Sequence, residues 1–236
     1  MGRAFEYRKE RKMRRWSSMA KAFTRIGREI AMAVKEGGGD PNYNPRLRMA
    51  IQNAKMANMP KTNVENAIKK ATSKESENYL EIVYEGYAPH GVAVVVETAT
   101  DNTNRTVANI RHAFSKWGGS LGTTGSVDYM FNRKGLFKVK KDNIQLDELE
   151  LELIDFGLEE VKEEEGALHL YCNFTDFGSL QKALEEKGIE VENAELIRIP
   201  THFKELNDEQ VEDVIRLIEK LEEDEDVINV FHNMEE

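Results

Sequence analysis

The sequence has almost no cysteine and no long apolar segment. Its single cysteine, Cys172, cannot form an internal disulfide, and one thiol cannot build a cysteine-based zinc site. No run of about 18 or more apolar residues occurs, which argues against a membrane-spanning helix. No segment near residue 1 has the pattern of a secretory signal. We therefore expect a protein of the reducing cytoplasm, with no membrane partner.

Groups of residues typical of catalytic or metal sites are also missing. The five histidines have no ligand-like spacing: His90, His112, His169, His202 and His232. Acidic pairs such as Glu159 and Glu160 are not accompanied by a nucleophile or a cofactor motif, so solvated surface is the better interpretation. We predict no enzyme activity, no metal and no cofactor.

A glycine-rich stretch at residues 118–125 resembles a phosphate-binding loop at first sight. Such a loop leads into the N-terminus of a helix, whereas this one follows a predicted helix and precedes a predicted strand. We interpret it as a helix end followed by a turn. An exposed loop that contacts RNA is the alternative.

Charge is distributed very unevenly along the chain. Residues 1–78 contain 18 Lys and Arg against 8 Asp and Glu, a net charge of +10, although the whole chain has a net charge of −10. Residues 79–133 are nearly neutral at −1, whereas residues 134–199 and 200–236 have net charges of −9 and −10. A strongly basic third beside an acidic remainder indicates that the basic part binds an anionic partner.

The first predicted helix follows a basic arm. Ser17 or Ser18 can cap it, apolar residues recur at helical spacing from Phe23 to Val34, and the glycines at 37–39 end it. Residues before the serines form the arm.

Two more short helices are predicted before residue 78. An apolar stripe at 47–54 indicates the second, which ends before Pro60 because proline disfavours helical geometry in the residue before it. Thr62 and Glu65 have the spacing of a capping box, and apolar residues at 64–71 continue the third helix. The three helices are expected to form a small bundle.

From about residue 79 the pattern changes to alternating strands and helices. The β-branched run at 92–96 predicts a buried strand. Residues 101–103 offer helix caps, and apolar residues from 107 to 117 recur at helical spacing. A second strand is predicted at 127–131.

The next segment has a complete set of elements of its own. The predicted order is βαββαβ, the split arrangement of a ferredoxin-like sandwich: strand 135–140, helix 146–155, strand 158–162, strand 167–172, helix 177–187 and strand 190–199. A helix at 211–221 and a strand at 227–231 remain. Because a lone helix and strand cannot bury their apolar faces, we expect them to complete the sheet begun at residues 79–131.

These elements predict an α+β multidomain protein, in which an N-terminal three-helix bundle is followed by two ferredoxin-like α+β domains, one inserted in the other. The basic helical domain comprises residues 1–78. The second domain is discontinuous and comprises residues 79–133 and 200–236. The inserted domain comprises residues 134–199.

The basic arm is the strongest candidate for a binding site. Lys and Arg neutralise phosphates, and the interleaved Tyr7 and Trp16 can stack on unpaired bases. The candidate nucleic-acid-binding residues are Arg3, Arg8, Lys9, Arg11, Lys12, Arg14, Arg15, Lys21, Arg25 and Arg28, extended around the bundle by Arg46 and Arg48. One alternative is a solvated arm that binds only the chain's own acidic half. A mitochondrial transit peptide is another alternative, which the lack of a serine-rich stretch disfavours.

Motifs spaced over nearly the whole chain resemble the YebC family, also described as the YebC/PmpR probable transcriptional regulators, which includes the mitochondrial translational activator of cytochrome c oxidase. The motifs are Phe23-Thr24 through Arg28-Glu29-Ile30, Glu36-Gly37-Gly38-Gly39-Asp40-Pro41, Asn44-Pro45-Arg46-Leu47-Arg48, Ala57-Asn58-Met59-Pro60-Lys61, Tyr84-Glu85-Gly86-Tyr87, Thr100-Asp101-Asn102 with Asn104-Arg105-Thr106, Arg111-His112-Ala113-Phe114, Gly118-Gly119, Gly122, Gly125-Ser126-Val127, Asp226-Val227 with Asn229-Val230, and His232-Asn233.

The resemblance implies an N-terminal helical domain, two α+β domains with one inserted in the other, and a non-enzymatic regulator of gene expression. Family members are described as DNA-binding transcriptional regulators or as ribosome-associated translation factors that relieve stalling at proline-rich stretches. This sequence departs from the family at its N-terminus, where an Ala-Gly-His-Ser-Lys-Trp type segment is replaced by residues 1–7. It departs again after Tyr87, where the usual glycine-rich turn reads Ala88-Pro89-His90-Gly91.

The leading functional hypothesis is a DNA-binding transcriptional regulator that grips phosphates through its basic helical domain. A ribosome-associated or RNA-associated translation factor is the alternative, because no helix-turn-helix recognition surface and no dimer helix is evident, and a monomer is expected. A ferredoxin-like enzyme or a protein adaptor using the acidic surfaces is also conceivable from fold and charge. Replacing Arg11, Lys12, Arg14 and Arg15 by Gln separates nucleic-acid binding from an adaptor role.

Overall fold

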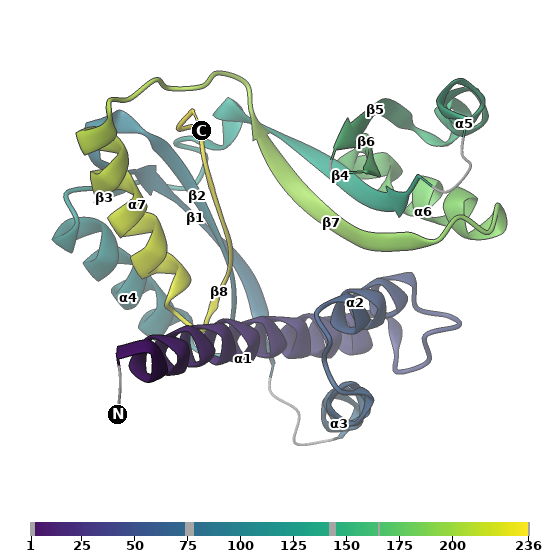
Figure 1. The fold of residues 1–236 in the computed structure, drawn as a ribbon, viewed down its shortest axis with the longest axis horizontal. Helices are drawn as coiled ribbons and strands as arrows, with labels where there is room; N and C mark the ends of the chain where they lie inside the picture. The colour runs from purple at the N-terminus through teal and green to yellow at the C-terminus, as the bar shows by residue number, and fades with distance from the viewer. Residues whose placement is uncertain (1–2, 74–77, 142–144, 165, 236) are drawn as a thin grey trace.

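Helices occur first along the chain, and two antiparallel sheets follow, with the second sheet inserted into the connections of the first (Figure 1). The computed structural model describes the backbone of residues 3–73, 78–141, 145–164 and 166–235, and the side chains from residue 19 onward within these ranges except that of residue 147. The α+β multidomain class predicted from the sequence is confirmed. The predicted domain boundaries at 78, 133 and 199 stay predictions.

Three helices form the N-terminal bundle: α1 (Arg3–Gly37), α2 (Pro45–Met56) and α3 (Lys61–Thr72). Their shared core contains Ile30 and Val34 of α1, Leu47 and Ala50 of α2, and Val64 of α3.

Helix α1 begins much earlier than the sequence predicts. A start at Ser17 or Ser18 is wrong, because the helix begins at Arg3 and runs for 35 residues, so the basic arm is its first half. Residues 3–16 contain mainly Arg, Lys, Glu, Ala and Met, which have high helix propensity, and no Pro or Gly. No Pro or Gly interrupts this segment, and the lower helix propensity of two serines costs too little free energy to end the helix there.

The ends of α2 and α3 are set differently. Pro45 occupies the first turn of α2, and the Asn44 side chain accepts a hydrogen bond from the Leu47 amide at 3.0 Å, a regular N-cap. The predicted capping box of Thr62 and Glu65 is wrong, because α3 begins after Pro60 and has no side-chain cap.

The first sheet contains strands β1 (Leu80–Tyr87), β2 (Ala93–Thr100), β3 (Ser120–Leu121) and β8 (Val227–His232) in the order β3-β1-β2-β8. Helices α4 (Thr103–Lys116) and α7 (Asp208–Glu222) pack on one face (Figure 1). Strand β8 pairs with β2, so the C-terminal helix and strand complete this sheet, as the sequence predicts.

Strand β2 is buried on both faces, which explains its unbroken β-branched run. Val94 and Val96 face α4 and α7, whereas Ala93 and Val95 contact Val127 and its neighbours on the opposite face.

The predicted strand at 127–131 is wrong. This segment is a 3₁₀ turn, Asp128–Met130, and the next strand begins at Phe131. Buried Glu85 of β1 accepts hydrogen bonds from the amides of Gly125, Val127 and Asp128 at 2.6–2.8 Å, which holds the segment in a turn. The glycine stretch before it ends α4, with Gly118 left-handed at φ +76°, as interpreted from the sequence.

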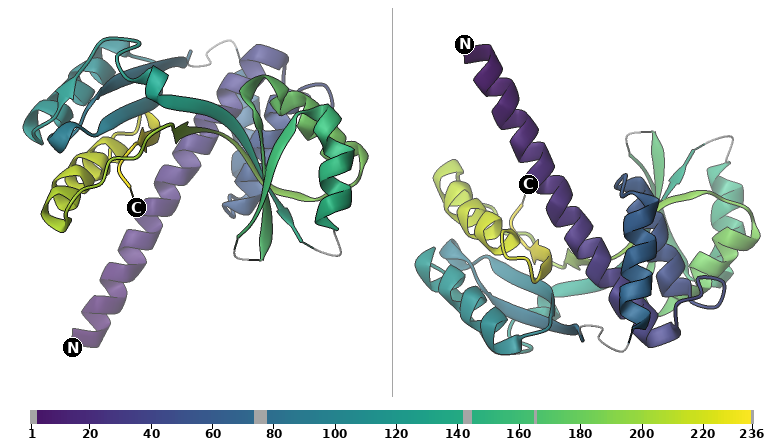
Figure 2. Two further views of the ribbon diagram at one scale, coloured as in Figure 1. Left: turned by 90° about the horizontal axis from the view of Figure 1, so that it is seen from above. Right: turned by 90° about the horizontal axis from the view of Figure 1, so that it is seen from below.

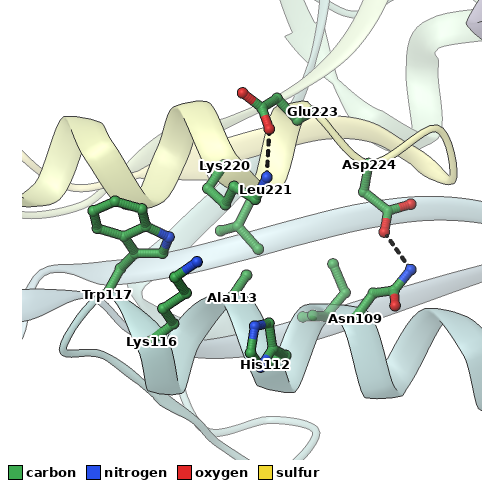
Figure 3. A pocket seen from close by; sticks show the side chains of 10 residues that line it. Asn109, His112, Ala113, Lys116, Trp117, Lys220, Leu221, Glu223 and Asp224 are labelled. Carbon is green, nitrogen blue, oxygen red and sulfur yellow. Dashed lines mark hydrogen bonds and ion pairs between the residues drawn. The ribbon is translucent and has the colours of Figure 1, made fainter.

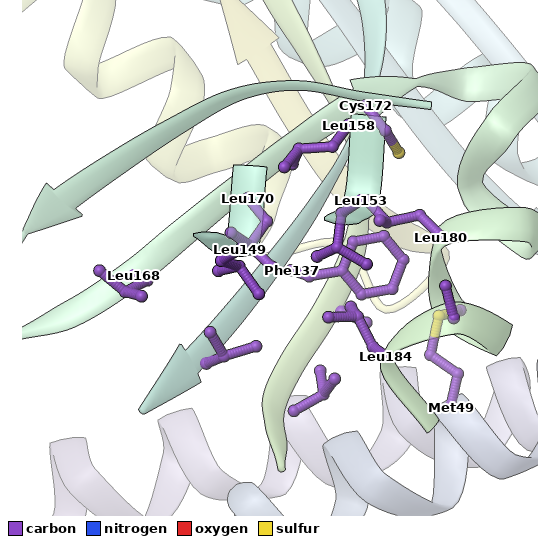
Figure 4. Close-up of a cluster of buried hydrophobic side chains, with 14 residues drawn as sticks. Met49, Phe137, Leu149, Leu153, Leu158, Leu168, Leu170, Cys172, Leu180 and Leu184 are labelled. Carbon is purple, nitrogen blue, oxygen red and sulfur yellow. The ribbon is translucent and has the colours of Figure 1, made fainter. Parts of the chain in front are cut away.

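The second sheet contains β4 (Phe131–Lys140), β5 (Leu158–Glu164), β6 (Ala167–Asn173) and β7 (Val191–Pro200) in the order β5-β6-β4-β7. With α5 (Leu146–Leu153) and α6 (Phe177–Glu186), this is the ferredoxin-like βαββαβ arrangement. Its core lies between the helices and one face of the sheet (Figure 4). Phe137 stacks on Phe177 with ring centroids 4.5 Å apart. The remaining 3₁₀ turns are Pro89–Gly91, Ile154–Phe156 and Phe174–Asp176.

Helix α2 joins the bundle to the inserted sheet. Met49 enters the core of that sheet (Figure 4). The Asn53 amide donates to the Ala194 carbonyl at 3.0 Å and accepts from the Ala194 amide at 3.4 Å, so one side chain pairs with the outer edge of β7. Among the described segments, no helix is long and apolar enough to cross a membrane.

Candidate nucleic-acid interface

Seven of the twelve predicted binding residues lie on the first half of α1. They are Arg3, Arg8, Lys9, Arg11, Lys12, Arg14 and Arg15, and their side chains lie outside the described part of the structure. The helix backbone in this region extends beyond the rest of the molecule in both views of Figure 2. Because 35 residues of helix span about 50 Å, the backbone of this half of α1 forms a long rod on which these seven residues lie.

Further along α1, the predicted cations meet the C-terminal end of α7. Arg25 donates to the Glu222 carbonyl at 3.3 Å, and Lys21 is half-buried in the same region. Carbonyls at a helix end are partly negative, so cations stabilise this contact.

Arg28 is bound within the chain. Its guanidinium is 3.0 Å from the Asp226 carboxylate and 3.0 Å from the Ala99 carbonyl, and it also donates to the Glu225 carbonyl. Its side chain is only 11% exposed. The residue therefore fixes α1 to the turn between α7 and β8.

Asp226 is the centre of this contact. Its carboxylate is 2% exposed and also accepts hydrogen bonds from Thr106 at 2.7 Å, Thr100 at 3.1 Å and Arg105 at 2.9 Å. Burial disfavours the charged form, but the hydrogen bonds from Thr106 and Arg105 and the charge of Arg28 outweigh it and hold the pKa of Asp226 below its ordinary value. The acidic run at residues 222–226 is typical of a solvated face, and that interpretation is wrong for buried Asp226, which also lies in one of the family motifs.

Arg46 and Arg48 also pair with carboxylates of the chain. Arg46 contacts Glu36 at 2.6 Å and also pairs with Glu81 of β1. Arg48 lies 3.2 Å from Glu185 of α6. These two arginines connect the helical bundle to the two sheets, so their charges are already partly neutralised.

A group of carboxylates lies where the bundle meets the sheets, and residue patterns gave no sign of it. Burial raises the pKa of Glu29 of α1 above its ordinary value; the charge of Arg46 opposes this, and those of Glu81 and Glu195 add to it. Burial likewise raises the pKa of Glu195 on β7. Three elements therefore bring acidic side chains together at this junction.

A groove of about 270 Å³ lies between α4 and α7 (Figure 3). Trp117, Lys116 and His112 line one side. Across the groove, Lys220 pairs with Glu223 at 2.5 Å, and Asn109 donates to Asp224 at 2.9 Å. Two pairs of its polar groups bind each other, whereas the buried Trp117 indole N–H has no hydrogen-bond partner among the described residues. Its lining residues include no Ser, Thr or Cys.

Two of the histidines lie beside carboxylates, and the cysteine is buried. His90 lies 3.1 Å from Asp213, and His169 lies 3.1 Å from Glu164. Among the described residues, no three His, Cys, Asp or Glu side chains are placed to hold a metal ion. Cys172 is fully buried, and burial raises the pKa of its thiol to about 11, which disfavours the reactive thiolate.

The architecture is thus an α+β protein in which a helical bundle with one long basic helix is fixed by ion pairs to two acidic sheet domains. The chain belongs to the TACO1/YebC family: residues 3–74 match the model of the TACO1/YebC protein N-terminal domain, and residues 79–234 match that of the TACO1/YebC second and third domain.

Relatives match over the whole length. A "probable transcriptional regulatory protein" of Flavobacterium johnsoniae is 60% identical over 236 residues, covering 100% of both chains. One of the same description from Porphyromonas gingivalis is 58% identical, covering 100% of this chain and 98% of the relative. The crystal structure of a conserved hypothetical protein from Aquifex aeolicus has a TM-score of 0.78 at 41% identity, covering 92% of this chain and 90% of the other.

Proposed function

We propose that this protein is a non-enzymatic regulator of gene expression that works in the cytoplasm and binds DNA through the first half of α1. The observation that supports it most is the extension of this helix, with its seven cations, beyond an acidic body (Figure 2). The names of the relatives agree with a regulatory role.

The same arrangement defines how the protein would bind. Arg and Lys on a protruding helix neutralise phosphates and release counterions, which gives affinity that falls steeply with salt. Phosphate contacts position a protein without reading sequence, so we expect weak sequence selectivity. Arg28, Arg46 and Arg48 hold α1 and α2 in place, and the binding energy comes from the cations N-terminal to them.

A ribosome-associated translation factor that relieves stalling is the second candidate. One basic helix on an acidic body provides electrostatic reach, whereas operator recognition usually uses two symmetric recognition helices. A monomer of this shape suits ribosomal RNA as well as it suits DNA.

Sedimentation of a cell lysate on a sucrose gradient tests both candidates. The wild type is compared with a helix variant, in which Arg11, Lys12, Arg14 and Arg15 are replaced by Gln. A control variant has the same charge change at four exposed cations elsewhere, Arg111, Lys182, Lys187 and Arg216.

Each outcome has a distinct meaning. Migration with DNA that DNase abolishes, and that only the helix variant loses, supports the DNA-binding proposal. Migration with ribosomal particles that survives DNase and weakens with salt supports the translation factor instead. Equal behaviour of the helix and control variants contradicts any role for the α1 cations.

A further inference from the structure

The inserted sheet has one covered and one uncovered face. Successive side chains of a strand point to opposite faces. On β4, Phe137 and Val139 point toward α5 and α6 and are fully buried, as are Leu168 and Leu170 on β6 (Figure 4). The alternate residues of these central strands therefore point to the other face, which α5 and α6 leave uncovered.

We propose that this uncovered face binds an unpaired strand of nucleic acid. We define it as the open sheet face, formed by Leu136 and Lys138 of β4, Lys162 of β5, and His169 and Tyr171 of β6. The proposal goes beyond the role of α1, because it places a second contact surface on a different domain.

The strand register brings these five side chains together. Lys138 lies opposite His169 on one side, and Lys162 lies opposite His169 on the other. Leu136 lies opposite Tyr171, and the Lys162 ammonium is 5.1 Å from the centre of the Tyr171 ring. Two rings thus lie two residues apart on one central strand, between apolar and cationic neighbours.

Charge favours a polyanionic ligand at this face. Residues 134–199 have a net charge of −9 and contain only eight Lys and Arg, of which four point to this side of the sheet: Lys134, Lys138, Lys140 and Lys162. An acidic domain that places half of its cations on its helix-free face provides a local match for phosphates.

Carboxylates also lie at this face. Glu195 of β7 lies opposite Leu136 and interacts with His169, and burial raises its pKa, which favours its neutral form. Lys134 pairs with Glu159, and Lys140 pairs with Glu190. Lys162 lies 3.3 Å from Glu160, and His169 lies 3.1 Å from Glu164, in pairs whose Glu side chains are more than half exposed. Exposed ion pairs contribute little, so a phosphate can exchange with them. Within the described part of the chain, no carboxylate pairs with Lys138, although this side chain is partly buried.

Unpaired bases fit the chemistry of the rings. Aromatic side chains on an open four-stranded sheet can stack on bases that are free of a duplex, and the flanking cations can bind the backbone. A duplex would not offer its base faces, so the open sheet face selects single strands. RNA and DNA strands share this chemistry.

The test measures binding of the full chain to fluorescein-labelled decamers of uridine RNA and thymidine DNA by anisotropy. Tyr171→Leu is expected to weaken binding about tenfold through loss of stacking, and Tyr171→Phe, which keeps the ring, to restore most of it. Lys138→Gln is expected to weaken binding about threefold and to reduce its salt dependence. Lys182→Gln is the matched control, because it removes an exposed cation on α6, on the opposite side of the sheet.

The outcomes separate this proposal from the role of α1. The helix variant Arg11, Lys12, Arg14 and Arg15→Gln is measured in parallel, and photocrosslinks from 5-iodouridine decamers are mapped by mass spectrometry. Crosslinks in residues 167–173 that persist in the helix variant support the open sheet face even if α1 binds nothing. If one decamer binds more tightly, its type, RNA or DNA, is the preferred ligand of the open sheet face.

The proposal is overturned if Tyr171→Leu binds both decamers as tightly as the wild type, or if all crosslinks map to α1. Loss of binding in Tyr171→Phe as well as in Tyr171→Leu, with unchanged thermal unfolding, also overturns it, because stacking needs only the ring.

Discussion

Individual side chains connect the domains of this protein to one another. Arg28, Arg46 and Arg48 each reach from the helical bundle to a carboxylate on a sheet domain, and Asn53 pairs with the backbone of β7. Residue types alone could not reveal this, because an arginine that binds phosphate and one that binds a distant carboxylate look the same in the sequence.

Replacing Asp226 by Asn should destabilise the protein strongly at neutral pH. The substitution leaves the guanidinium of Arg28, which is only 11% exposed, without its charge partner, whereas Arg105 keeps Asp101. The loss should cost about 3 kcal/mol of unfolding free energy. The comparison is Asp213→Asn, an exposed carboxylate beside His90, which should cost less than about 1 kcal/mol. Denaturant unfolding at pH 7 measures both.

The pH dependence of the Asp226 effect has a definite sign. The folded-state pKa of Asp226 lies below the ordinary value of 3.8, so its contribution is present above that value and is lost as pH falls through the folded pKa. The gap between wild type and Asp226→Asn should therefore shrink in strong acid. A difference in unfolding free energy that does not change with pH would show that Asp226→Asn destabilises the protein through altered packing and not through loss of charge.

Glu29→Gln should have the opposite effect on stability. The folded-state pKa of Glu29 is raised, so its stabilising contribution is complete below the unfolded pKa and is lost as pH rises through the folded pKa. At pH 7 the neutral Gln removes the cost of a buried charge, and the melting temperature should rise by about 3 °C.

The same comparison at low pH provides the internal check. Below about pH 4, where Glu29 is protonated in both states, variant and wild type should melt together. Glu65→Gln, an exposed residue paired with Lys61, should show no rise at pH 7. A lower melting temperature for Glu29→Gln at pH 7 would show that the carboxylate is charged and favourably paired.

Among the elements, α1 shows most clearly what sequence patterns can and cannot establish. Its apolar stripe predicts the buried half, and the glycines at 37–39 predict the end. Its start could not be predicted, because Ser17 and Ser18 have the residue type of an N-cap but lie inside the helix. Similarly, the turn at 128–130 depends on Glu85, which lies about 40 residues earlier and meets it only in the folded chain.

Arg28→Leu should loosen the attachment of α1 to the first sheet domain. The residue contacts Asp226 and two carbonyls, whereas Arg25, one turn earlier, donates to a single carbonyl at 3.3 Å. We expect Arg28→Leu to lower the unfolding free energy by about 3 kcal/mol and Arg25→Leu by less than about 1 kcal/mol.

Hydrogen exchange locates the effect of that substitution. Amides of α1 near residue 28 should exchange faster in Arg28→Leu, and those in the core of the inserted sheet should not change. Uniform acceleration over the whole chain would mean that Arg28 supports global folding and not the position of one helix.

In the molecule as a whole, the separation of charge along the sequence becomes a separation in space. The cations of residues 3–15 extend on one helix, and the acidic sheet domains lie along the rest of it (Figures 1 and 2). The order of strands and helices in the inserted domain was predictable from the hydrophobic period. The pairing of the C-terminal strand with the first sheet was also predictable, because a lone strand cannot bury its apolar face. Strands β1 and β3 were not predicted, and the strand predicted at 127–131 is a turn. The angle of α1 was not predictable either, since it depends on the contacts of Arg28 and Asp226.

The central claim, that the first half of α1 binds nucleic-acid phosphates, is tested most directly by the salt dependence of duplex DNA binding. The slope of log Kd against log salt is measured for the wild type, for the helix variant at Arg11, Lys12, Arg14 and Arg15, and for the control variant at Arg111, Lys182, Lys187 and Arg216. The account predicts a slope smaller by about 3–4 in the helix variant alone, because each lost phosphate contact removes about 0.9. Equal slopes in the helix and control variants would contradict it.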